Sequence, residues 1–323
     1  MNLREMIFYN TNGLPSDKPK ENKFWITQGP SDFVLKENDL TLDIESQAIY
    51  LRNLLAEKVF GSQQRYYDQL PFAPLWISKA GIDSDIKISK EEFEKLIANA
   101  DALTCKFLYY YDVSSLIGSL QNSVQEVRHL MGEFYRELNE NSFMLMPEPF
   151  EQDTVMFASG LMVTRLFTSV NHIFIALYSQ LDFITKICYE MEQMDDNYIA
   201  YKKIKSAKIL FGDARRTSLN GKPDTLFADS VNIKMIQTLR NEIVHNASFE
   251  DVQKVFQVFK SSIMVEKFIL LPDFENGIIK THKNRKRFFD QEIKLNEILP
   301  ELIFDFWKRL HQTLKILVED SGG

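Results

Sequence analysis

The chain has 323 residues, of which 45% are hydrophobic and 26% charged, so it can fold around one or two apolar cores. Its formal net charge of −7 excludes a protein that coats nucleic acid through overall charge, although local basic segments exist. Two cysteines, Cys105 and Cys188, are too few for a disulfide framework or a four-ligand zinc site. We predict that both are buried thiols in apolar helical segments.

The first 38 residues mix Asn, Gly, Pro, Ser and Lys without a clear period. They predict an irregular arm with one strand near residues 24–26, and they contain no apolar segment typical of a signal peptide. The most apolar stretch, residues 155–181, is interrupted by Arg165 and His172. A bilayer-spanning helix needs about 20 nearly uninterrupted apolar residues. We therefore expect a cytoplasmic protein without a membrane span.

Helical periodicity dominates the part of the chain before residue 150. Apolar residues return every three or four positions, which favours helices over strands. A capping box at Ser89–Glu92 marks the start of one helix, because each side chain can bond the backbone of the other. Residues 61–88, which include Pro71, Pro74 and Gly81, predict a connector. The helices are expected at residues 40–60, from residue 89 onward, and at 105–138.

The second half of the chain is also predicted to be mainly helical. Asn276–Gly277 suits positive φ and predicts a short β-hairpin near residues 266–280. Asp229 or Ser230 can cap one helix, and a second capping box at Ser248 predicts another. The helices are expected at residues 153–194, 231–246, 248–259 and 293–318.

Pro147 and Pro149 mark the best domain boundary in the sequence. We therefore predict two domains, a mostly helical region at 1–150 and a helical domain at 151–323. The fold class is mainly α.

The helix predicted at residues 231–246 carries an unusual polar face. Asn241 and His245 are four residues apart and point roughly opposite to the apolar stripe, while Arg240 lies on its flank. Packing does not require a histidine on the face away from the core, which favours a functional role for His245. A histidine that is merely solvated on the polar side of an amphipathic helix would give the same sequence pattern. The predicted stripe consists of Ile236, Leu239, Ile243 and Ala247.

The run from Thr238 to Asn246 resembles the R-x4-6-H motif of the HEPN superfamily, with Arg240 and His245 as its ends. Residues 171–182 resemble the first helix of that family, and the resemblance covers about residues 153–320. It implies a HEPN-like helical bundle that dimerises and brings two motifs together across a two-fold axis. Many such proteins are metal-independent endoribonucleases of toxin–antitoxin and phage-defence systems.

Carried over to this chain, the resemblance makes Arg240, Asn241 and His245 the catalytic set, with no metal and no cofactor. A histidine ordinarily titrates near neutral pH and can move the protons, and an arginine can hold phosphate oxygens in a bidentate fork. Asn241 can orient either the histidine or the phosphate. Arg240 and His245 are about 140° apart on one ideal helix, so a second copy is needed to complete the site.

Two residues on the preceding helix, Tyr178 and Asp182, are candidates for supporting this site. Asp182 can approach Arg240 and fix its guanidinium, or it can simply pair with a neighbouring helix. Basic residues in two runs are candidates for contacts with the RNA backbone, although each run alone is also typical of a solvated surface. These residues are Lys202, Lys203, Lys205, Lys283, Arg285, Lys286 and Arg287.

Three interpretations of the motif stay open. The first is a HEPN endoribonuclease that acts as a toxin or phage-defence effector and cleaves RNA by attack of the 2′-hydroxyl in a dimeric site. The second is a non-catalytic HEPN module that binds a nucleotide, RNA or a partner protein. The third is a helical scaffold in which the motif is coincidence. An antitoxin or nucleotidyltransferase partner would be encoded separately.

Overall fold

The computed structural model describes residues 6–20, 23–36, 40–79, 88–143, 153–194, 198, 217–250, 252–286 and 288–321. Over these residues the protein is mainly α-helical, as the sequence predicts. It divides into two compact units. The first comprises residues 1–41, 123–179 and 229–308, and the second residues 42–122, 180–228 and 309–323. Both units contain residues from either side of residue 150, so they do not follow the expected division at that position.

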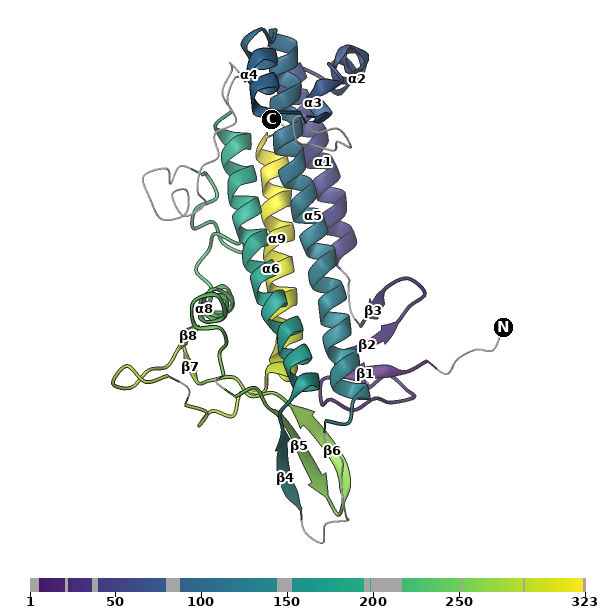
Figure 1. Ribbon diagram of the computed structural model, residues 1–323, viewed down its shortest axis with the longest axis vertical. Coiled ribbons are helices and arrows are strands. Elements are labelled where there is room, and N and C mark those ends of the chain that lie inside the picture. The colour runs from purple at the N-terminus through teal and green to yellow at the C-terminus, as the bar shows by residue number, and fades with distance from the viewer. Residues whose placement is uncertain are drawn as a thin grey trace. The chain divides into compact units, whose positions relative to one another are not determined.

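Three long helices contribute residues to both units: α5 (Ala102–Glu140), α6 (Leu161–Glu192) and α9 (Leu295–Ser321) (Figure 1). In the first unit α5 and α6 are antiparallel. Ser123 Oγ donates to the Ala176 carbonyl at 3.3 Å, and further along α5 the Glu137 carboxylate accepts from Arg165 at 2.7 Å. The core of this unit consists of apolar side chains on the facing sides of the helices, among them Met131, Phe134, Phe167, Val170, Ile303 and Phe306.

Helix α6 has the length and composition of a helix that could cross a membrane. However, 44% of its most apolar 18-residue stretch is buried inside the protein. Such a helix is weak evidence for a membrane, because core helices have the same composition. The predicted core stripe of α6 is confirmed, since Val170, Phe174 and Leu177 are fully buried. Core packing therefore accounts for much of its apolar character.

The amino-terminal residues form a sheet instead of the expected irregular arm with one strand. Strands β1 (Phe8–Asn10), β2 (Trp25–Gln28) and β3 (Phe33–Leu35) pair antiparallel in chain order. Phe33 packs on α5 at Gly132, where a Cβ atom would lie 2.0 Å from the Phe33 ring. Only a glycine permits this approach.

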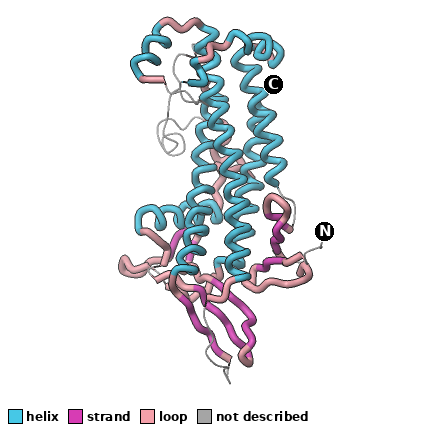
Figure 2. The backbone as a smooth tube through the Cα atoms, turned by 45° about the vertical axis from the view of Figure 1, so that its right-hand side comes forward, coloured by secondary structure: helices cyan, strands magenta, loops and turns pink. Residues whose placement is uncertain are grey.

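A second sheet contains β4 (Thr154–Ala158), β5 (Val255–Lys260) and β6 (Ile263–Phe268), in that order, and it corrects two predictions. The helix expected from residue 153 begins only at residue 161, and the helix expected to continue from Ser248 through residue 259 is strand β5 from residue 255. Alternate residues of β5 are buried, which is the period of a strand. Figure 2 shows these strands apart from the amino-terminal sheet.

The expected β-hairpin is confirmed, and it packs on α8 (Val231–Asn246). Strands β7 (Phe274–Glu275) and β8 (Ile278–Ile279) are joined by Asn276 and Gly277, with φ of 53° and 81°. Two positive φ angles are typical of a type I′ turn. A Cβ atom on Gly277 would lie 2.5 Å from the carbonyl oxygen of Val231, so this turn lies directly against the start of α8.

The second unit begins within α1 (Leu40–Phe60), a helix with the bounds that the sequence predicts. The expected connector at 61–88 was wrong in part, because it includes α2 (Gln63–Gln69), the 3₁₀ helix η1 (Leu70–Phe72) and α3 (Trp76–Lys79). Ser62 caps α2 by accepting from the Arg65 amide at 3.1 Å. Short helices of this kind rely on such local caps more than on an apolar period.

Helix α4 (Lys90–Ala98) starts at the predicted capping box. Ser89 Oγ accepts from the Glu92 amide at 3.2 Å, and Glu92 accepts from the Ser89 amide at 2.9 Å. Two orphan amides of the first turn are thereby satisfied.

A buried polar junction holds the first unit together where α5 ends. Lys267 of β6 is 3% exposed, and its amine donates to the carbonyls of Asn139 and Asn141 at 2.8 and 2.9 Å. The Asn139 side chain also exchanges two hydrogen bonds with the backbone of Asn10 on β1. At the start of α9, Asn296 accepts from the amide of Ile269 at 3.0 Å.

Burial lowers the pKa of Lys267 from 10.5 to about 8. Between these values the unfolded chain binds more protons than the folded one, so stability rises with pH there. We expect the free energy of unfolding to gain about 2–3 kcal/mol from this group between pH 7.5 and 10. Urea denaturation at both pH values measures it, with Lys267→Met as the control that lacks the gain. Parallel pH profiles for the two proteins would contradict the assignment.

Helix α8 is followed by Ala247, its C-terminal cap, which has φ of 67° in the left-handed region that favours glycine. We expect Ala247→Gly to raise the free energy of unfolding by about 0.5–1 kcal/mol, because it relieves the Cβ clash. In contrast, Ala56→Gly inside α1 should lower it by about 1 kcal/mol or more. Chemical denaturation of both variants checks the opposite signs, and destabilisation by both would be inconsistent with the left-handed cap.

Candidate functional site

Helix α8 presents the predicted motif on its outer side. Ser230 caps the helix by accepting from the Ile233 amide at 3.4 Å. The apolar stripe packs inward, with Leu239 fully buried, whereas Asn241 and His245 are exposed. The expected orientation is therefore confirmed for these two side chains. Ala247 does not belong to the stripe, because it is exposed and ends the helix.

The guanidinium of Arg240 has a defined direction. Its Cζ lies 4.6 Å from the ring centroid of Tyr178, which α6 supplies, and its Nη1 donates to Asn241 Oδ1 at 3.0 Å. A cation over an aromatic face is attracted by the electron-rich ring. The structure thus brings together three of the predicted residues: Tyr178, Arg240 and Asn241.

His245 lies on the last turn of α8, one residue before the helix ends. It lies five positions after Arg240, with four residues between them, which corresponds to a rotation of about 140°. Arg240 turns toward Tyr178, whereas His245 is exposed. One copy of α8 therefore supplies a cation and an imidazole in different directions.

Glu242 is a member of this region that the sequence did not reveal. It is 8% exposed, its Oε1 forms an ion pair with Lys286, and its Oε2 accepts from the Asn246 side chain at 2.9 Å. Lys286 was predicted to contact RNA, but its amine is engaged with this carboxylate. Nothing near Glu242 in sequence signals its burial, because its cation comes from 44 residues further along the chain.

The basic segment after β8 forms a tight turn. The amide of His282 donates to the Arg285 carbonyl and the amide of Arg285 to the His282 carbonyl, both at 2.9 Å. The two residues between them, Lys283 and Asn284, have φ of 48° and 62°. Lys283 and Arg285 are exposed, as contacts with an RNA backbone require.

Several predicted residues are not placed at this site. Lys202, Lys203, Lys205 and Arg287 lie outside the described residues. Asp182 belongs to the second unit and Arg240 to the first, so the expected approach of Asp182 to Arg240 stays a prediction.

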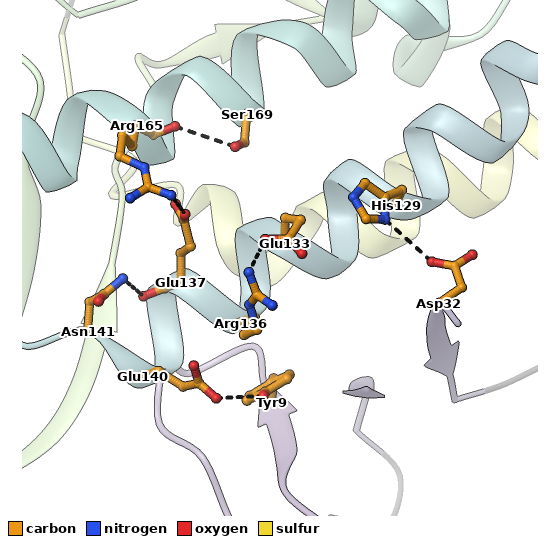
Figure 3. A network of polar contacts seen from close by, with 10 residues as sticks. All are labelled: Tyr9, Asp32, His129, Glu133, Arg136, Glu137, Glu140, Asn141, Arg165 and Ser169. Carbon is orange, nitrogen blue, oxygen red and sulfur yellow. Dashed lines mark hydrogen bonds and ion pairs between the residues drawn. The ribbon is translucent and has the colours of Figure 1, made fainter. Parts of the chain in front are cut away.

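The described part of the chain contains no group of three or more His, Cys, Asp or Glu side chains that could hold a metal ion. Acidic residues on α5 and the nearby Asp32 form a network with cations and a hydroxyl group (Figure 3). His129 Nδ1 lies 3.6 Å from Asp32 Oδ1, and Glu140 accepts from the Tyr9 hydroxyl at 2.6 Å. Burial and this acceptor raise the pKa of Tyr9 above its ordinary value. Because the network links α5 to the amino-terminal strands, its role is structural.

Comparisons with protein-family models, with curated proteins and with solved structures found no match for this chain. The candidate site therefore rests on its own residues and their geometry.

The contact between Arg240 and Tyr178 can be measured. In a double-mutant cycle with Arg240→Ala and Tyr178→Leu, we expect a coupling of about 0.5–1 kcal/mol in the free energy of unfolding, because the cation loses its ring. Tyr178→Phe keeps the ring and should retain the coupling. A coupling near zero in the Leu cycle would mean that the two side chains do not interact in solution.

Proposed function

We propose that this protein is a metal-independent endoribonuclease of HEPN type that acts in the cytoplasm as a toxin or phage-defence effector. The supporting observation is the outer side of α8, where Asn241 and His245 are exposed and Arg240 is directed by Tyr178. These are the residues of the R-x4-6-H motif, and no packing requirement accounts for an imidazole and an amide together there.

In the proposed reaction, His245 accepts the proton of a ribose 2′-hydroxyl. The 2′-oxygen attacks the adjacent phosphorus, and the bond from phosphorus to the 5′-oxygen breaks. The His245 of a second copy protonates that leaving oxygen, which gives a 2′,3′-cyclic phosphate and a 5′-hydroxyl end. Arg240 stabilises the charge that develops on the phosphate oxygens.

The proposed active form is a homodimer. Arg240 and His245 diverge on one helix, whereas a two-fold axis beside α8 supplies two of each to one cleft. Val244, next to His245, is an aliphatic side chain that is 48% exposed, as expected for a residue that packs on a second copy. In this proposal an antitoxin or nucleotidyltransferase would restrain the dimer.

The test is cleavage of total RNA by the purified protein in excess EDTA. We expect cleavage that survives EDTA, that falls about 10²–10⁴-fold in His245→Ala, and that falls about 10²–10³-fold in Arg240→Ala. The products should carry 2′,3′-cyclic phosphate ends.

Matched controls are His172→Ala and Arg165→Ala, exposed residues of α6 that pair with Glu126 and Glu137. Both should cut RNA at the parent rate. Equal losses in the controls, or cleavage that EDTA abolishes, would refute the nuclease proposal. RNA or nucleotide binding without any cleavage would favour the non-catalytic module instead.

A further inference from the structure

The basic turn at 282–285 is tied to the helix that carries His245. The side chain of Glu242 is 11% exposed and contacts two segments: Lys286, just after the turn, and Asn246, on the last turn of α8. Leaving such a carboxylate buried without a cation is costly. The ion pair therefore holds the basic turn beside the end of α8.

The base of the same segment is also fixed. Asp273 is 3% exposed, and its Oδ1 accepts from the amide of Gln291 at 2.8 Å. Its own amide donates to the Phe288 carbonyl at 2.7 Å, and its carbonyl accepts from the Lys280 amide at 2.8 Å. These bonds close the loop on both sides of the turn, so its tip has little conformational freedom to lose on binding.

The tip of the turn presents two cations that a ligand can reach. Glu242 neutralises Lys286, which leaves the exposed cations Lys283 and Arg285 on the turn. A lysine and an arginine at fixed positions suit adjacent backbone phosphates, the arginine through its planar fork.

We propose that residues 282–285 form a phosphate-binding arm that holds the RNA backbone next to the reacting phosphodiester, and that Glu242 is the positioning residue of this arm. This inference rests on the proposed ribonuclease function. Glu242 does not touch the RNA; it fixes the arm and the last turn of α8 relative to each other, so that the bound backbone lies at His245.

The arm is tested by binding in a His245→Ala background, in which the RNA stays intact. The probe is a fluorescent single-stranded 20-nucleotide RNA, and its anisotropy gives the affinity at several salt concentrations. Lys283→Ala and Arg285→Ala should each weaken binding about 3- to 10-fold and lower the slope of log affinity against log salt by about 0.7. Lys260→Ala, an exposed lysine of β5, is the matched control and should change neither.

Glu242→Gln gives a test in which two explanations predict opposite signs. Removing a negative charge should tighten RNA binding if only net charge matters. Loss of a positioned arm should instead weaken binding about 3- to 10-fold and raise KM for cleavage more than it lowers kcat. Lys286→Arg keeps the ion pair and should bind like the parent, and circular dichroism checks that each variant is folded.

Binding that is unchanged or tighter in Glu242→Gln, or an unchanged salt slope in both arm variants, would overturn the proposal. These outcomes are separable from failure of the nuclease. Cleavage that depends on His245 with no effect of the arm variants refutes the arm alone. Arm-dependent binding by a protein that never cuts RNA refutes the nuclease alone.

Discussion

The first unit is organised by the need to satisfy the carbonyl groups at the end of a long buried helix. The last carbonyls of a helix have no intrahelical donor, and burying them unpaired is unfavourable. Lys267 supplies the donors for Asn139 and Asn141 at the end of α5, at the cost of placing an amine in the interior. Because Lys267 lies on β6, this contact fixes the β4–β5–β6 sheet to the end of α5, and Asn296 extends the same junction to α9.

The same principle, that a buried charge needs a partner, shapes the surface of α8. Two of its charged side chains have defined partners: the half-buried Arg240 lies over the ring of Tyr178, and the buried Glu242 pairs with Lys286. Their neighbours Asn241 and His245 are exposed. In the proposed site, Arg240 is thus a cation of fixed direction, and Asn241 and His245 are exposed side chains that a substrate can reach. This arrangement is the physical basis of the proposed site. Because Arg240 and His245 diverge on the helix, one copy supplies only part of it.

The success of sequence-based prediction in this protein follows the range of the interactions involved. Helix α1, the capping box at Ser89 and the turn at Asn276–Gly277 depend on neighbouring residues, and all three were predicted. The prediction of a helix at strand β5 is wrong because a short apolar run fits both periods, and the strand's pairing partners lie elsewhere in the chain. Glu242 was missed for the same reason: its burial depends on Lys286.

We propose that the face of α8 with His245 becomes an active site only when a second copy meets it. The most direct measurement is a subunit-mixing titration. The parent protein is co-expressed at graded ratios with an Arg240→Ala/His245→Ala variant, and RNA cleavage is measured on the purified mixtures. A composite site that needs both copies predicts activity proportional to the square of the parent fraction. Activity proportional to the parent fraction itself would contradict the account.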